Sequence, residues 1–233
     1  MNDESVRRSV PSLQVMLHRM FETQPRLPPG TALTIGIACL VAVAFPVTWS
    51  FVRYLGTMAH EGSHAVVGSL YGRKIEGIRL HLKDATGSTD APGEGGNVPI
   101  LFIGYFGPSL LGLGAAKLIA MGHSVAVLWL TLALLALLLA QMRNVIGMLL
   151  IVVAGYVIYI FARYGTVARE TLAAYGIAWL LLLVGIRTVL HRWGGSGDGQ
   201  GLKAWSGSSQ EVFSQIWLVG ALFALFLGTR MLM

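Results

Sequence analysis

Long apolar runs separated by short polar stretches dominate the chain. Most of them have roughly the 20 residues that an α-helix needs to cross the hydrocarbon core of a bilayer, and the second is shorter. About seven such segments can be delimited, at residues 31–52, 54–71, 98–119, 123–142, 144–162, 169–190 and 212–232. The pattern predicts an all-α polytopic membrane protein with about seven transmembrane helices. These form one transmembrane domain over residues 31–233, after a polar N-terminal segment over residues 1–30.

The connection between the second and third apolar segments, residues 72–97, follows a different pattern. Apolar and polar positions alternate over residues 74–84, and the apolar positions are Ile78, Leu80 and Leu82. Alternation at a period of two is typical of a strand with one apolar face, and the turn-forming residues that follow favour a reversal of the chain. The sequence therefore predicts a short β-hairpin-like insertion after the second helix. A second polar connection, residues 191–211, precedes the last apolar segment.

Composition supports the membrane assignment. The chain is 55% hydrophobic and 12% charged, with a mean hydropathy of +0.66, and a soluble domain carries roughly twice that share of charged residues. The single cysteine, Cys39, excludes an internal disulfide and a zinc ribbon. The net charge of +6 comes from basic residues scattered at the ends of apolar segments. This distribution indicates a lipid bilayer as the partner and no nucleic acid.

The basic residues also predict an orientation, because cytoplasmic loops of membrane proteins are enriched in Lys and Arg. With seven spans and the N-terminus in the cytoplasm, the inner side carries Arg7, Arg8, Arg19, Arg26, Arg73, Lys74, Arg79, Lys83, Arg143, Arg187, Arg192 and Lys203. The outer side carries only Arg53, Lys117, Arg163, Arg169 and Arg230. We therefore expect an integral multi-pass protein with a cytoplasmic N-terminus.

One polar group interrupts the second apolar segment, in the stretch AHEGSHA at residues 59–65. On a helix His60 and His64 project from the same face one turn apart, so two imidazoles can bind one divalent ion. Glu61 lies beside them, where it can take a proton from a water molecule as a general base. Ionisable residues inside a membrane are expensive and point to function, although two hydrogen-bonded histidines at a helix interface are the alternative. This H-E-x-x-H motif predicts a zinc site.

Several stretches together resemble the site-2 protease family of intramembrane zinc metalloproteases, and more narrowly its compact M50B-like branch. The similarity begins with the stretch TMAHEGSHAVVGSLYGRKIEGIRLHLKDATGST at residues 57–89. It continues with GYFGPSLLGLG at 104–114 and MRNVIGMLL at 142–150, and ends with the GSGDGQGLKAWSG loop before a last span that contains QIWLV. The resemblance implies that His60 and His64 are zinc ligands and that Glu61 is the general base. It also implies that the substrates are membrane-anchored proteins.

The third zinc ligand departs from the family pattern. Site-2 proteases supply an aspartate from a later membrane helix, and the later apolar segments here contain none. Asp198, in the last polar loop, is the leading candidate. Asn144 is the alternative, either as a ligand or as a contact to the substrate or the oxyanion, and His81 and Asp84 are weaker options.

These observations predict an intramembrane zinc metalloendopeptidase that hydrolyses peptide bonds of membrane-anchored substrate proteins. The predicted hairpin offers a strand edge along which an unwound substrate could pair. Two alternatives stay open because no later span carries an aspartate. One is a catalytically inactive protease relative that acts as a membrane binder, and the other is a transporter that uses His60, Glu61 and His64. No motif specifies an oligomeric state.

Overall fold

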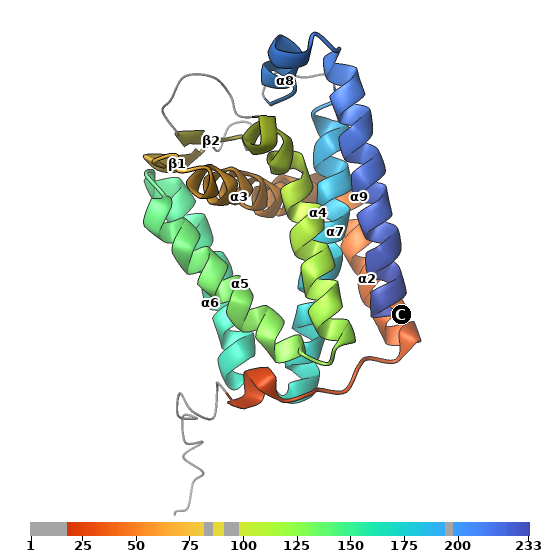
Figure 1. The fold of residues 1–233 in the computed structure, drawn as a ribbon. Helices are drawn as coiled ribbons and strands as arrows, with labels where there is room; N and C mark the ends of the chain where they lie inside the picture. The colour runs from red at the N-terminus through yellow and green to blue at the C-terminus, as the bar shows by residue number, and fades with distance from the viewer. Residues whose placement is uncertain (1–17, 82–85, 91–97, 194–197) are drawn as a thin grey trace, which may run out of the picture.

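The computed structural model describes residues 18–81, 86–90, 98–193 and 198–233. Most of the predicted N-terminal segment, together with Lys83 and Asp84, therefore lies outside the described residues. The helices are α2 Pro29–Ala44, α3 Pro46–Leu70, α4 Val98–Ala120, α5 Ser124–Gln141, α6 Val145–Tyr164, α7 Val167–His191, α8 Asp198–Ser206 and α9 Gln210–Leu232 (Figure 1). The strands are β1 Gly77–Leu80 and β2 Gly87–Asp90.

Five of these helices, α4, α5, α6, α7 and α9, are long and apolar enough to cross a membrane. The pair α2–α3 passes the same test jointly but is bent by 100°, so the described residues hold five or six candidate spans instead of about seven. Phe45 is extended and Pro46 is the first residue of α3. A proline lacks the backbone N–H and disfavours helical geometry in the residue before it, which explains why the helix breaks here. Helix α3 then runs across the bundle (Figure 1).

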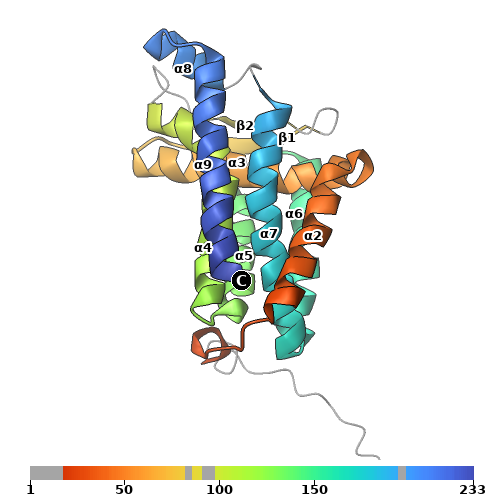
Figure 2. The ribbon, with the colours of Figure 1, turned by 90° about the vertical axis from the view of Figure 1, so that its right-hand side faces the viewer.

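Helix α7 occupies the centre of the bundle and contacts α2, α3, α4, α5, α6 and α9. Figure 2 shows α9, α7 and α2 lined up, with α3 crossing behind them. Gly112 of α4 approaches the α7 backbone so closely that an added Cβ would lie 2.8 Å from the amide nitrogen of Leu182. Small residues allow such close helix approach in membranes. Gly112 thus allows α4 to pack closely against α7.

The predicted hairpin is confirmed as a two-stranded antiparallel sheet in which Ile78 pairs with Thr89 and Leu80 with Gly87. Ile78 and Leu80 are fully buried, whereas Arg79 faces outward and forms an ion pair of 3.4 Å with Asp90. The alternation seen in the sequence therefore describes β1 correctly. Contacts with α3 and with the α5–α6 junction hold the sheet against the helices.

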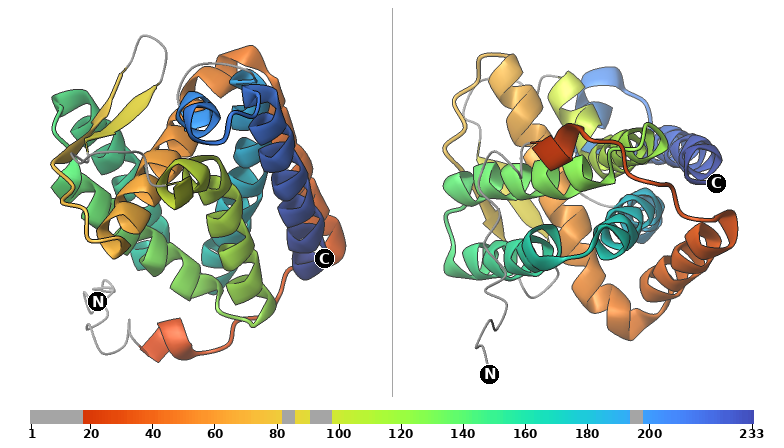
Figure 3. Two further views of the ribbon diagram at one scale, coloured as in Figure 1. Left: turned by 45° about the horizontal axis from the view of Figure 1, so that its top comes forward. Right: turned by 90° about the horizontal axis from the view of Figure 1, so that it is seen from below.

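Residues 18–28 lie at the end of the bundle opposite the hairpin, so the seven-span arrangement was wrong about which connections share a side of the bundle (Figures 1 and 3). The amide of Gln24 donates to the carbonyl of Gly122 at 2.7 Å, and the Arg19 guanidinium pairs with Glu170 at 2.6 Å. The seven-span arrangement had placed Arg19 and the turn near Gly122 on opposite faces. The difference arises because α2 and α3 form one bent pair.

This correction removes the charge asymmetry. At or near the hairpin end lie Arg53, Arg73, Lys74, Arg79, Arg143, Arg187, Arg192 and Lys203. At the other end lie Arg19, Arg26, Lys117, Arg163, Arg169 and Arg230. Because both ends are basic, the rule of cytoplasmic positive charge no longer favours one orientation. A cytoplasmic N-terminus stays a prediction from the sequence.

Candidate metal centre

Helix α3 carries His60 and His64 on one face, one turn apart, as the i, i+4 spacing predicts. Their rings face each other with centroids 4.7 Å apart, and the two Nε2 atoms are separated by 3.1 Å. Both side chains are largely buried, with 14% of His60 and 9% of His64 exposed. The two imidazoles therefore present their Nε2 atoms to a common point.

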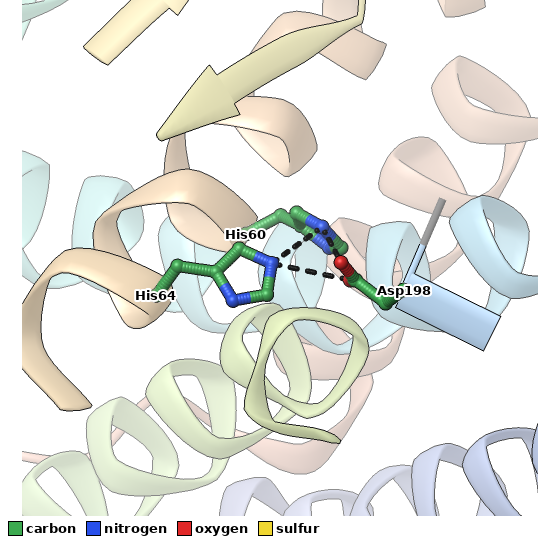
Figure 4. Close-up of side chains that lie close together, drawn as sticks. All are labelled: His60, His64 and Asp198. Carbon is green, nitrogen blue, oxygen red and sulfur yellow. Dashed lines mark hydrogen bonds and ion pairs between the residues drawn. The ribbon is translucent and has the colours of Figure 1, made fainter. Parts of the chain in front are cut away.

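Asp198, the first residue of α8, completes a group of three (Figure 4). Its Oδ2 atom lies 3.1 Å from the Nε2 atom of His60 and 3.1 Å from that of His64. A tetrahedral zinc ion with bonds of about 2.0–2.1 Å separates its ligand atoms by about 3.3 Å. The triangle of Nε2, Nε2 and Oδ2 thus matches one face of a zinc tetrahedron, and these residues form a group that could hold a metal ion.

The hydrogen bond made by Nδ1 of His64 determines that the lone pair of its Nε2 atom faces the point between His60, His64 and Asp198. Its Nδ1–H donates to the carbonyl of Ile100 at 2.7 Å, which leaves Nε2 without a proton in the neutral ring. A hydrogen bond of this kind fixes the tautomer of metal-binding histidines. A carboxylate oxygen faces the same point, and like electron pairs at this distance repel unless positive charge lies between them.

The charge on Asp198 is set by its surroundings. Burial favours a raised pKa of its carboxyl, but when no cation lies between the three groups and the rings of His60 and His64 are protonated, their hydrogen bonds and positive charge outweigh burial. They hold the pKa of Asp198 well below its usual range. Asp198 therefore stays ionised at neutral pH, which is the state that binds a cation.

Gly104 of α4 makes room for the two rings. A Cβ added to this residue would lie 2.6 Å from Cε1 of His60 and would also collide with Nε2 of His64. Tyr105 follows in the chain and places its ring edge-on to His60, with centroids 4.7 Å apart. The glycine-rich stretch of the third predicted span thus forms one wall of the centre.

Glu61 lies next to the histidines and is 5% exposed. Its Oε2 atom accepts a hydrogen bond of 2.6 Å from the hydroxyl of Thr89 in β2, and its backbone carbonyl lies 3.2 Å from the same hydroxyl. The hairpin therefore covers Glu61 and contacts its carboxylate directly.

Comparison with known proteins adds a family assignment. A model of the family described as Peptidase M50B-like matches residues 33–228, which is most of the chain. The chain belongs to the Peptidase M50B-like family. No curated protein and no solved structure was found to match. The resemblance predicted from the sequence motifs is thereby confirmed at the level of the family.

The other candidate residues of this M50B-like peptidase lie elsewhere. Asn144 binds the backbone of Leu80, because its Nδ2 donates to the Leu80 carbonyl at 2.6 Å and its Oδ1 accepts from the Leu80 amide at 3.1 Å. His81 is exposed at the end of β1, and Asp84 lies outside the described residues. Among the residues described, the group that could hold a metal comprises His60, His64 and Asp198. A contact from Asn144 to substrate or oxyanion stays a prediction.

Sequence reasoning missed Thr89 in this M50B-like peptidase. The turn-rich composition around residues 84–96 marked the second half of the hairpin as a connection. The pairing register of the hairpin could have indicated this residue. Thr89 pairs with the apolar Ile78, and paired residues lie on the same face of the sheet. What the sequence could not supply is the packing of that face on α3.

Proposed function

We propose that the chain is an intramembrane zinc metalloendopeptidase that hydrolyses peptide bonds of membrane-anchored substrate proteins. In this proposal His60, His64 and Asp198 hold zinc, and Glu61 is the general base. The observation that carries the proposal is the convergence of the two Nε2 atoms and Oδ2 at mutual distances of 3.1 Å, beside a buried glutamate. Membership of a peptidase family supports it.

The donor set fits zinc, because two imidazole nitrogens and one carboxylate oxygen leave one position of a tetrahedron open. Zinc bound there would supply Lewis acidity towards a water molecule and the scissile carbonyl. Glu61 takes the proton of the attacking water and passes it to the leaving amine nitrogen. Of the two carboxylate oxygens of Glu61, Oε2 is the one that accepts from Thr89, and we assign the contact with the water to Oε1.

The hairpin supports an extended mode of substrate binding. A peptide bond inside a helix has its carbonyl hydrogen-bonded within the helix, so a substrate must unwind before it is cut. Strand β1 pairs with β2 on one edge and meets Met142 on the other. The outer edge of β2 is the one to which an extended substrate can add, and it lies in the strand that contacts Glu61.

The alternatives predicted from the sequence rested on the lack of an aspartate in a later span. Asp198 reaches the histidines from α8, outside the candidate spans, and this weakens the reason for an inactive relative or a transporter. Each alternative predicts a different experimental result. A transporter would show ion flux that depends on His60 and Glu61, and an inactive relative would bind a substrate without cutting it.

The test compares purified full-length wild type with Glu61→Gln and His64→Ala. Elemental analysis measures zinc, and a transmembrane peptide substrate reports cleavage. Glu61→Gln is expected to keep zinc and to lose cleavage, because glutamine cannot take a proton. His64→Ala is expected to lose both. Stoichiometric zinc in His64→Ala, or cleavage by Glu61→Gln at the wild-type rate, would refute the proposal.

A further inference from the structure

Strand β2 holds the carboxylate of Glu61. We propose that Thr89 is a positioning residue that fixes this carboxylate in the orientation a general base requires. This inference rests on the proposed function and deepens it, because it assigns to the hairpin a part in the hydrolytic step itself.

The contact is short and specific. The Thr89 hydroxyl lies 2.6 Å from Oε2 of Glu61 and 3.2 Å from the backbone carbonyl of the same residue. A carboxylate can only accept, so the hydroxyl donates to it. Hydrogen bonds to ionised groups are shorter and roughly twice as strong as those between neutral groups. With Glu61 95% buried, this bond replaces one that water would otherwise make.

The register of the hairpin brings two residues to Glu61 from the same face of β2. Residues at i and i+2 of a strand share a face, so Gly87 and Thr89 point together towards α3. A Cβ at Gly87 would lie 2.6 Å from Oε1 of Glu61, which means that only glycine leaves the side chain in place. Thr89 therefore binds one carboxylate oxygen while Gly87 lies against the other.

The hairpin is itself anchored, so that it can hold another group in place. Asn144 binds both backbone groups of Leu80, and the amide of Arg143 donates to the carbonyl of Ile78 at 2.9 Å. The Nε–H of Arg143 donates to the carbonyl of Glu76 at 2.8 Å. These bonds tie β1 to the α5–α6 junction, and β1 in turn pairs with β2. A continuous set of contacts therefore connects the α5–α6 junction to the proposed base.

Orientation matters because a general base must lie within hydrogen-bond reach of the proton that it removes. A carboxylate held through one oxygen cannot rotate freely and presents the other oxygen in one direction. Without the Thr89 hydroxyl, the buried carboxylate of Glu61 would rotate towards another hydrogen-bond donor. We expect substrate binding and metal binding to be unchanged, because the hydrogen bonds of the Thr89 hydroxyl described here go to Glu61 and not to His60, His64 or Asp198.

The kinetic test uses Thr89→Val, Thr89→Ser and the control Ser88→Ala. Valine has the shape of threonine without the hydroxyl, serine keeps the hydroxyl, and Ser88 points to the opposite face of β2. In Thr89→Val we expect kcat to fall about tenfold or more while KM stays within about twofold and zinc content is unchanged. Thr89→Ser is expected to restore most of kcat, and Ser88→Ala to match wild type.

A second measurement reports the contact without relying on activity. Thermal unfolding of the full-length protein in detergent is compared for wild type, Thr89→Val, Glu61→Gln and the double variant. Because the bond to a charged carboxylate is the stronger one, Thr89→Val is expected to lower Tm more in the wild-type background than in the Glu61→Gln background. Equal losses in both backgrounds would mean that Thr89 does not act through Glu61.

The outcomes separate this inference from the proposed function. If wild type neither binds zinc nor cleaves, the proposed function fails, and the unfolding cycle still decides whether the two residues are coupled. If wild type cleaves and Thr89→Val keeps the wild-type kcat, the positioning role is refuted while the protease survives. A Thr89→Val variant that loses zinc, or whose defect lies wholly in KM, also refutes the role.

Discussion

Gly104 shows how a single missing side chain can determine a site. The nearest atoms to a Cβ at this position belong to the rings of His64 and His60, whereas a Cβ at Gly114 in the same helix would meet nothing within 4 Å. Gly104→Ala is therefore expected to displace the imidazoles and to weaken zinc binding at least about tenfold, as measured by competition with a chelator. Gly114→Ala is the matched control and should bind zinc as wild type does. Equal zinc affinity in both variants would contradict the geometry described.

Asp198 is the residue on which the third-ligand assignment depends. Asp198→Ala is expected to reduce zinc affinity by at least about tenfold, because a tetrahedral site with two ligands left binds the ion weakly. Asp90→Ala serves as the control, since Asp90 is an exposed acid paired with Arg79. If Asp198→Ala still held one zinc ion per protein in the presence of a competing chelator, the third ligand would have to be another residue.

The pH dependence of zinc binding should follow the histidines and not the aspartate. A carboxyl with a lowered pKa contributes stability that is complete above its ordinary pKa and is lost only when the pH falls through its lowered value. Asp198 has such a pKa, so it stays charged through the mildly acidic range. Imidazoles must be neutral to bind zinc, and their ordinary pKa is about 6.5. Zinc affinity, titrated from pH 8 to 3, is therefore expected to fall as the histidines take up protons; an affinity that stays constant until the pH falls below about 4 would assign the loss to a carboxyl.

At the scale of elements, Asn144 joins the hairpin to the helices. Its amide both donates to and accepts from Leu80, so Asn144→Ala leaves two buried backbone groups unpaired at a cost of about 1–3 kcal/mol each. We expect the Leu80 amide to exchange hydrogen faster in this variant and the zinc content to stay at the wild-type level. Loss of zinc in Asn144→Ala would instead support the ligand role that the sequence left open.

The sequence predicted some elements well and others poorly, for physical reasons. The i, i+4 histidines and the alternating Ile78 and Leu80 express local periodicity, which is a property of one segment alone. The break at Phe45–Pro46 was missed because the apolar run continues on both sides of it, and a single proline barely changes the mean hydropathy of such a run. Asp198 could be named only as a candidate, since its place beside His60 depends on how α8 packs.

At the scale of the whole molecule, counting the bent pair α2–α3 as one span gives six candidate crossings in the described residues, an arrangement in which residue 18 and Met233 lie on the same side of the membrane. Phe21 and Met121 are exposed at one end, and Ser208 precedes α9 at the other. Single cysteines are introduced at these positions in a Cys39→Ser background and labelled with a thiol reagent that cannot cross the membrane. Phe21→Cys and Met121→Cys are expected to be labelled from one side, and Ser208→Cys from the other. The seven-span arrangement predicts instead that Phe21→Cys pairs with Ser208→Cys.

The separation of the three proposed ligands along the chain has a consequence for biosynthesis. His64 leaves the ribosome 134 residues before Asp198, which at about 5–20 residues per second is a delay of roughly 7–27 seconds. During that interval the nascent chain holds both imidazoles without their carboxylate. If these residues hold zinc as proposed, hydrolysis can begin only after α8 has been made and Asp198 has reached the histidines, when synthesis has arrived at the last span.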